Sequence, residues 1–159
     1  MNILDALTSG PAAFRGEGVN EEKETFIGKM TVQVLEGGRA ALLSYTATLT
    51  TGAVVHTEST LLGTGPGGNL CLWPVMSEIP VVLPHTQLMT KTKSPKEIAT
   101  VFCSGLRDES SSFREEITIQ INSDGTLVYA HAWGLPGGAF EDRSSCLMVR
   151  SEANPCRTS

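Results

Sequence analysis

The sequence predicts an all-β protein, an antiparallel up-and-down barrel of about ten strands with a short N-terminal helix. Three observations lead to this class. Strand-like runs follow one another along most of the chain, turn signals rich in glycine and proline separate them, and several runs alternate apolar with polar residues. Helical spacing of apolar residues is confined to the first ten positions, so the helix is predicted there.

The N-terminal segment 1–10 supplies that helix. Ile3, Leu4 and Leu7 recur at helical spacing, and Gly10-Pro11 follows as a helix terminator. After Phe14 the turn signals are those of a β-protein, among them EGG at 36–38, GPGG at 65–68 and NSDG at 122–125. They separate ten predicted strands, which are 14–20, 26–35, 39–49, 53–63, 69–75, 79–83, 97–103, 113–121, 126–134 and 145–150.

Short connections between successive runs favour antiparallel neighbours, since parallel strands need long crossovers. Ten strands in one open sheet would leave two long edges unpaired, and closure into a barrel removes them. A barrel of that size has more interior than its side chains fill, so a ligand cavity is expected. The alternative is a β-sandwich, whose core would be dry.

The segment 70–85, LCLWPVMSEIPVVLPH, is apolar but broken by Pro74, Pro80 and Pro84. Proline cannot donate a ladder hydrogen bond, so this part must be an edge, a bulge or a bent rim. As a lip over the barrel mouth it would place Trp73 and Met76 in the lining. It could equally be irregular strands packed on the core, and an exposed apolar rim would also suit a homodimer contact.

The composition of the chain argues against several classes of binding partner. The 159 residues suit one domain, 1–159, with 151–159 as a flexible tail. A net charge of −5 argues against nucleic acid and anionic membrane surfaces, and no apolar run is long enough to insert in a membrane. The N-terminus does not resemble a signal peptide, and Cys71, Cys103, Cys146 and Cys156 lack disulfide or metal spacing, so a reducing, cytoplasmic location is expected.

Two short motifs sit at fixed places in this order of strands. The first strand contains FRGEG at 14–18, and the fourth contains GAVVHTE at 52–58. This layout resembles calycin (lipocalin-like) barrels, and among them the nitrobindin-like family related to fatty-acid-binding proteins. That family has a W-x-G-x-G first strand and an H-x-E on about the fourth strand, which His56 and Glu58 match; Phe14 replaces the tryptophan.

The resemblance also raises the question of a cofactor. Haem-binding members of the family carry an iron-ligating histidine after the last strand, whereas this sequence has no histidine beyond His131. Haem would bind only if His131 took that role near His56. We therefore expect no cofactor and no other metal, with haem as the alternative.

His56 and Glu58 are the first candidate site residues. Residues two apart on a strand share a face, so the carboxylate can orient the imidazole or share a water with it, which is the minimum for a general base. The alternatives are a solvated strand face or a buried polar pair. Alternation places Val54, Thr60 and Leu62 on the same face.

Tyr129, His131 and Trp133 form the second candidate group. They lie on one face of run 126–134, whereas the other face carries small residues. If the large face lines a cavity, it supplies aromatic walls and hydrogen-bonding groups, as small-molecule pockets do; if not, it is a core aromatic cluster. His85, after Pro84, is predicted to lie in a loop without a role.

The remaining polar clusters are predicted to be solvated. Lys91, Lys93 and Lys96 form the one basic cluster, interpreted as a loop, and 107–112 is interpreted as an exposed hairpin connection. Nucleophile-elbow and phosphate-binding motifs lack their structural context.

Three functions follow. The leading one is non-enzymatic binding of a small, mainly apolar molecule in the cavity, with His56, Glu58, Trp73, Tyr129, His131 and Trp133 nearby. The alternatives are a nitrobindin-like haem protein acting on reactive nitrogen or oxygen species, and a small isomerase or hydrolase using His56 and Glu58.

Overall fold

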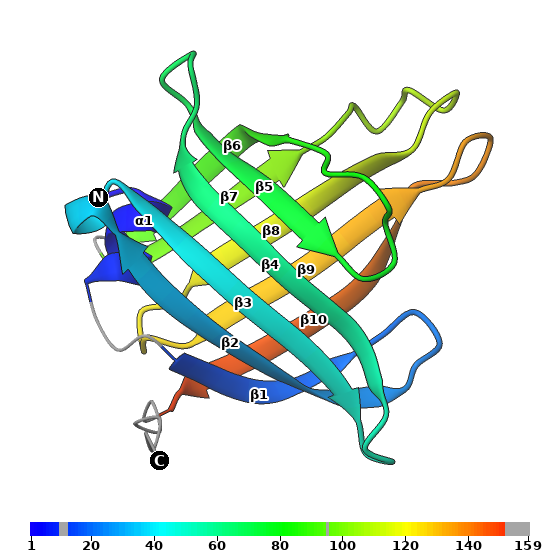
Figure 1. The fold of residues 1–159 in the computed structure, drawn as a ribbon, viewed down its shortest axis with the longest axis horizontal. Helices are drawn as coiled ribbons and strands as arrows, with labels where there is room; N and C mark the ends of the chain where they lie inside the picture. The colour runs from blue at the N-terminus through cyan, green and yellow to red at the C-terminus, as the bar shows by residue number, and fades with distance from the viewer. Residues whose placement is uncertain (10–12, 95, 152–159) are drawn as a thin grey trace.

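Ten antiparallel strands close into a barrel in the computed structural model, which describes residues 1–9, 13–94 and 96–151 (Figure 1). The predicted fold class is confirmed. The elements are α1 (Ile3–Thr8), β1 (Ala13–Val19), β2 (Thr25–Leu35), the 3₁₀ turn η1 (Glu36–Gly38), β3 (Ala40–Leu49), β4 (Val54–Thr64), β5 (Leu70–Met76), β6 (His85–Ser94), β7 (Glu97–Cys103), β8 (Arg114–Ile121), β9 (Leu127–Gly134) and β10 (Glu141–Arg150).

Each strand pairs with its sequence neighbours, and β1 closes the barrel by pairing with β10 from Phe14↔Arg150 to Val19↔Ser145. The sandwich alternative is therefore wrong. The pairing between β5 and β6 is short, with the two register pairs Cys71↔Thr86 and Leu72↔His85. The pairing is short because the two strands are joined through the proline-broken segment 70–85, in which the prolines cannot donate ladder hydrogen bonds.

The short helix α1 covers one end of the barrel (Figure 1). A capping box begins it: the Asn2 side chain accepts from the Asp5 amide, and the Asp5 carboxylate accepts from the Asn2 amide. Ile3, Leu4 and Leu7 are buried against the core. The predicted helix is thus confirmed over Ile3–Thr8; its terminator Gly10-Pro11 and the predicted tail beyond Ser151 lie outside the described residues.

The sixth strand was misplaced by the sequence analysis. Residues 77–84 form a loop, and the strand is His85–Ser94 instead of the predicted 79–83. Pro80 and Pro84 interrupt the ladder of the apolar run, whereas Thr86, Thr90 and Thr92 are β-branched and suit a strand. Lys91 and Lys93 accordingly belong to β6, which corrects the basic-loop interpretation; Lys96 lies in the turn before β7.

The inward faces of the strands form one apolar core between α1 and the middle of the barrel. On β8, Ile117, Ile119 and Ile121 are buried, as their alternation predicts. Across from them, Leu43, Leu62 and Leu72 are fully enclosed. This core fills the helix-covered half, so free volume in the interior is concentrated toward the other end.

Three of the four cysteines lie within the described residues. Cys71 and Cys146 are buried, Cys103 is half-buried, and all three are free thiols, as predicted. Cys156 is outside this range. None of the helices that the structure describes could span a bilayer.

The motif FRGEG has a packing role where β1 meets β10. A Cβ on Gly16 would overlap the backbone oxygen of Leu147 and come within 2.7 Å of the Met148 Cα. A Cβ on Gly18 would overlap the ring of Phe26. Glycine is therefore required for the close approach that closes the barrel.

We expect Gly16→Ala to lower the free energy of unfolding by about 2 kcal/mol or more, as overpacking does. Urea denaturation followed by circular dichroism measures this. Gly63→Ala is the matched control, because a Cβ there meets Ala40 at an ordinary 3.5 Å and the change should stay within about 1 kcal/mol. Equal losses in both variants would contradict the packing role of Gly16.

Candidate functional site

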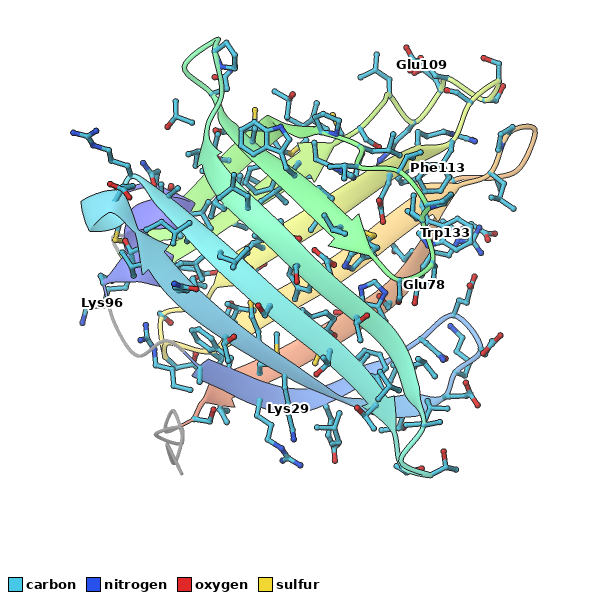
Figure 2. All side chains as sticks on the ribbon, in the orientation of Figure 1. Lys29, Glu78, Lys96, Glu109, Phe113 and Trp133 are labelled. Carbon is cyan, nitrogen blue, oxygen red and sulfur yellow. The ribbon has the colours of Figure 1, made fainter. Side chains whose placement is uncertain are left out.

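A cavity of about 420 Å³ opens at the end of the barrel opposite α1. Figure 2 shows Glu78, Phe113 and Trp133 together at this end, far from Lys96. The lining comes from strand ends and from the loops that join them. It comprises Asn20, Glu21, Glu22, Phe26, Tyr45, Ala47, Val55, His56, Met76, Glu78, Ile79, Phe113, Glu115, His131, Trp133, Leu135, Arg143 and Ser144.

Strand alternation in β4 turns His56, Glu58 and Thr60 toward the interior. Glu58 and Thr60 are buried, whereas the intervening Thr57 and Ser59 are exposed. His56 stands one step nearer the mouth, with its side chain 20% exposed, and lines the cavity. The HTE motif therefore points into the barrel.

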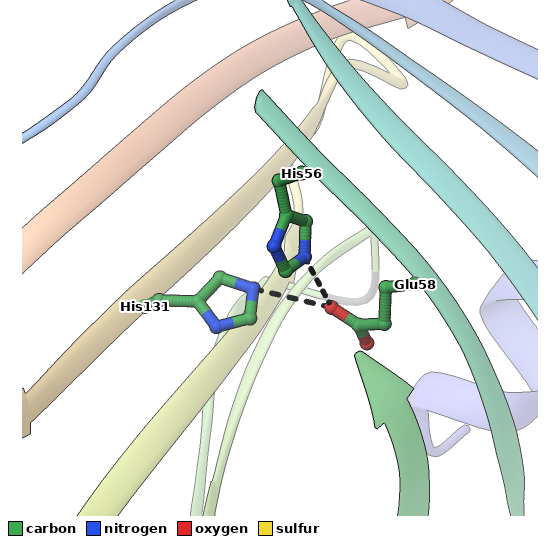
Figure 3. A group of neighbouring side chains, drawn as sticks. All are labelled: His56, Glu58 and His131. Atoms are coloured by element: carbon green, nitrogen blue, oxygen red, sulfur yellow. Dashed lines mark hydrogen bonds and ion pairs between the residues drawn. The ribbon is translucent and has the colours of Figure 1, made fainter. Parts of the chain in front are cut away.

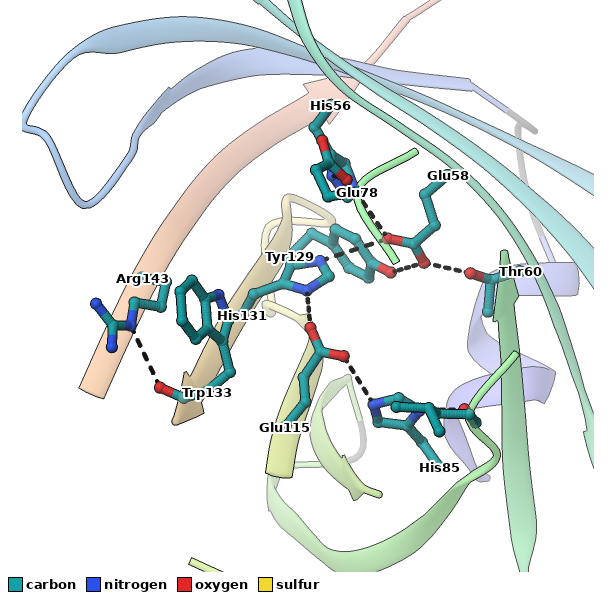
Figure 4. A network of polar contacts seen from close by, with 11 residues as sticks. His56, Glu58, Thr60, Glu78, His85, Glu115, Tyr129, His131, Trp133 and Arg143 are labelled. Carbon is teal, nitrogen blue, oxygen red and sulfur yellow. Dashed lines mark hydrogen bonds and ion pairs between the residues drawn. The ribbon is translucent and has the colours of Figure 1, made fainter. Parts of the chain in front are cut away.

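Glu58 is the centre of a buried hydrogen-bond network (Figure 4). The Tyr129 hydroxyl donates to its Oε1 at 2.6 Å, and the Thr60 hydroxyl donates to the same atom. Nε2 of His56 donates to its Oε2 at 3.2 Å. Only 4% of Glu58 is exposed, so these donors replace water around the carboxylate.

A second buried carboxylate, Glu115 on β8, lies on the other side of His131. Its Oε1 accepts from Nδ1 of His131 at 3.1 Å, and its Oε2 accepts from Nε2 of His85, also at 3.1 Å. Nδ1 of His85 donates to the backbone oxygen of Leu83 at 2.7 Å. Both ring nitrogens of His85 therefore face hydrogen-bond acceptors.

Hydrogen bonds outweigh burial in setting the charge of both carboxylates. Burial works to raise the pKa of Glu58, but the bonds from His56, Thr60 and Tyr129 lower it overall. Burial likewise opposes ionisation of Glu115, yet the bonds from His131 and His85 lower its pKa to about 2. Both side chains are thus anions inside the barrel.

The same network raises the pKa of two of its donors, His56 and Tyr129. Burial works to lower the pKa of His56, but the carboxylates of Glu58 and Glu78 outweigh it and raise the pKa. Glu78, in the loop after β5, accepts from Nδ1 of His56 at 2.8 Å. Burial and the charge of Glu58 raise the pKa of Tyr129 well above its ordinary value, so the phenol keeps its proton and donates.

The aromatic members pack edge to face around His131. Its ring centroid lies 5.1 Å from that of Tyr129 and 5.6 Å from that of His56. Nearer the mouth, the Arg143 guanidinium lies 4.0 Å over the Trp133 ring, and Phe113 is 6.2 Å from the same ring. Five of the six candidate residues are therefore close together at or below the cavity.

The sixth candidate, Trp73, lies elsewhere. Along β5 the buried residues Leu72, Pro74 and Met76 alternate with Trp73 and Val75, which places Trp73 on the outer face. Of the described residues that line the cavity, β5 supplies Met76, as predicted, and not Trp73. Because Pro74 interrupts the alternation of apolar and polar residues in β5, the sequence does not show which side chains of this strand point inward.

Sequence reasoning missed Glu115, Glu78 and His85. The prediction that His85 lies in a loop without a role is wrong, since it begins β6, is fully buried and bonds to Glu115. Pro84 is the last residue of the loop, and β6 begins directly after it. The signal for Glu115 was present: it is two residues before Ile117, on the same inward face of β8.

Arg114 organises the loops on one side of the mouth. It is buried, and its guanidinium donates to the backbone oxygens of Leu135 (2.7 Å), Gly138 (2.8 Å), Arg107 (3.2 Å) and Ser112 (3.4 Å). Segment 107–112 is exposed, as predicted. These bonds tie the β7–β8 and β9–β10 connections together beside Phe113 and Trp133.

Comparison with known proteins supports the fold. No family model matches this chain, and a search of curated proteins found no match. Among solved structures the chain is similar to the crystal structure of Rv2717c from M. tuberculosis, with 14% sequence identity and a TM-score of 0.74. The match covers 94% of this chain and 97% of that chain, and at this identity it shows a shared barrel fold alone.

The arrangement around His131 does not fit a haem iron. Nδ1 of His131 is held by Glu115, and Nε2 is buried 3.5 Å from Oε2 of Glu58. One nitrogen of His131 is thus taken by a hydrogen bond, and the other is enclosed beside the Glu58 carboxylate.

The Tyr129 hydroxyl should contribute more to stability than that of Tyr45. We expect Tyr129→Phe to cost about 2 kcal/mol of unfolding free energy, because it removes a buried bond to a charged carboxylate. Tyr45→Phe is the matched control, since that hydroxyl bonds to the Cys146 thiol, a weak partner, and should cost less than about 1 kcal/mol. Urea denaturation that ranks the two variants the other way would contradict the network.

Proposed function

We propose that this protein binds a small, mainly apolar, uncharged molecule in the cavity at the open end of the barrel, without transforming it. The observation that carries the proposal is a cavity of about 420 Å³ with apolar walls and a polar inner end. Cavities of this size with few polar groups are typical small-molecule sites.

The apolar walls and the polar inner end of the cavity would contribute differently to ligand binding. Phe26, Met76, Ile79, Phe113 and Trp133 offer apolar surface, from which a ligand would gain affinity by desolvation. His56, His131 and Glu115 at the inner end would fix the orientation of one polar group of the ligand.

The charges in and around the cavity disfavour an anionic ligand. Glu21, Glu22 and Glu78 line its mouth, and Glu115 lies at its inner end. Arg143, the cation in the lining, is paired with Glu21 at 2.5 Å and Glu141 at 3.3 Å. An anionic ligand would meet repulsion from these carboxylates.

Acid–base catalysis is the second candidate function, because His56 reaches the cavity and lies within hydrogen-bonding distance of Glu58. In that case His56 would exchange the proton with a substrate and Glu58 would orient it, since three donors already surround the carboxylate. Conversion of a bound molecule that stops in His56→Gln would favour this candidate; binding without conversion favours the first.

Membership of the nitrobindin-like family is not part of the proposal, since the similarity to Rv2717c concerns the fold alone. A homodimer through the 70–83 rim stays a prediction; Val75, Val81 and Val82 are exposed there.

The two tryptophans allow a direct test of binding in this cavity. Trp133 lines it and Trp73 does not, so Trp73→Phe leaves one tryptophan inside the site and Trp133→Phe leaves one outside. On titration with the uncharged dye Nile red, we expect saturable quenching of Trp133 emission through energy transfer and a weaker effect on Trp73. Native mass spectrometry would then identify any molecule that co-purifies.

Filling part of the cavity should weaken this binding. Ala47 on β3 lines the cavity, so Ala47→Leu should weaken dye binding at least about tenfold, which corresponds to 1.4 kcal/mol. Ala130→Leu, on the outer face of β9, is the matched control and should bind as the parent does. Equal binding in both variants would place the dye outside the cavity and contradict the proposal.

A further inference from the structure

The side chains of His56, Glu58 and His131 converge at one place inside the barrel (Figure 3). The ligand atoms of His56, Glu58 and His131 all lie within 4.8 Å of one another. His56 and Glu58 come from β4 and His131 from β9, on the opposite wall of the barrel. Two imidazoles and one carboxylate are a common ligand set for divalent transition metals.

One of these atoms lacks a hydrogen-bond partner among the described residues. Nε2 of His131 is buried and forms no hydrogen bond, although it lies 3.5 Å from Oε2 of Glu58. A buried, unpaired polar atom is costly. A cation held between Nε2 and the carboxylate would remove that cost.

The opposite nitrogen of each imidazole is already positioned as in a metal site. Nδ1 of His131 donates to Glu115 at 3.1 Å, and Nδ1 of His56 donates to Glu78 at 2.8 Å. Metal-ligating histidines usually donate their second nitrogen to a carboxylate in this way, which fixes the ring and leaves the other nitrogen toward the ion. Here Nε2 of both rings faces the same oxygen of Glu58.

The separations also suit a bound ion. Oε2 of Glu58 lies 3.2 Å from Nε2 of His56 and 3.5 Å from Nε2 of His131. Tetrahedral bonds of about 2.0–2.1 Å place neighbouring ligand atoms roughly 3.3 Å apart. We propose that His56, Glu58 and His131 bind a divalent first-row transition ion such as Zn²⁺, with water or a ligand group completing its coordination from the cavity.

Titration of the chelator-treated full chain with Zn²⁺ alone tests this, independently of any small-molecule ligand. Isothermal titration calorimetry should give one ion per chain. Co²⁺ should give the visible bands of a tetrahedral nitrogen and oxygen site, without the charge-transfer band of thiolate ligands.

Variants assign the ligands. We expect Glu58→Gln and His131→Gln to weaken Zn²⁺ binding by more than about 100-fold, and Glu78→Gln, which acts through His56, by about 10- to 100-fold. His56→Gln changes a ligand whose side chain is 20% exposed, so it tests the site even if a variant at a buried ligand does not fold. Glu17→Gln is the matched control, an exposed carboxylate on the outer face of β1 and outside the cavity lining, which should leave the affinity unchanged.

Three results would overturn the proposal: no Zn²⁺ binding by the native chain, a Co²⁺ spectrum with thiolate charge transfer, or unchanged affinity in folded His56→Gln. If the protein bound Zn²⁺ but not Nile red, only the proposed function would be contradicted. Failure of the metal site and failure of the proposed function are therefore distinguishable.

Discussion

The burial of two ionised carboxylates inside a closed barrel constrains the rest of this structure. Glu58 and Glu115 are 4% and 2% exposed, and a barrel interior offers them little water. Each must therefore be surrounded by donors from the opposing strands. That requirement explains why Tyr129, His131 and His85 are buried polar residues, and why their hydroxyl and ring nitrogens point toward the carboxylates.

The hydrogen-bond network of Glu58 and Glu115 also lies between two different parts of the barrel interior. On the side of α1 the strands pack isoleucine and leucine side chains into a filled core, whereas on the other side the loops leave a cavity of about 420 Å³. The hydrogen-bonded imidazoles form the inner end of that cavity. Fold and site are linked here, because closure between β1 and β10, made possible by Gly16, brings β9 opposite β4 and thus His131 opposite Glu58.

Strand number and closure could be predicted from sequence because turn signals and period-two alternation are local properties. The alternation also places His56 and Glu58 on one face of their strand, but it does not show which face points inward. The sixth strand could not be predicted, since apolar content favoured 79–83 while the prolines prevented a ladder there. Glu115 was overlooked for a different reason: a carboxylate on an apolar face contradicts ordinary burial preferences, and its partners lie 16 and 30 residues away along the chain. Such partners become visible only when the strands are placed in register.

The most direct test is to determine which ring nitrogen of each histidine carries a proton. The chain has three histidines, and Nδ1 of each faces an acceptor: Glu78 for His56, the Leu83 backbone oxygen for His85 and Glu115 for His131. Long-range proton–nitrogen NMR of the metal-free protein should therefore show a proton on all three Nδ1 atoms. A neutral His131 with its proton on Nε2 and a bare Nδ1 would show that Glu115 does not hold it, and would contradict the network.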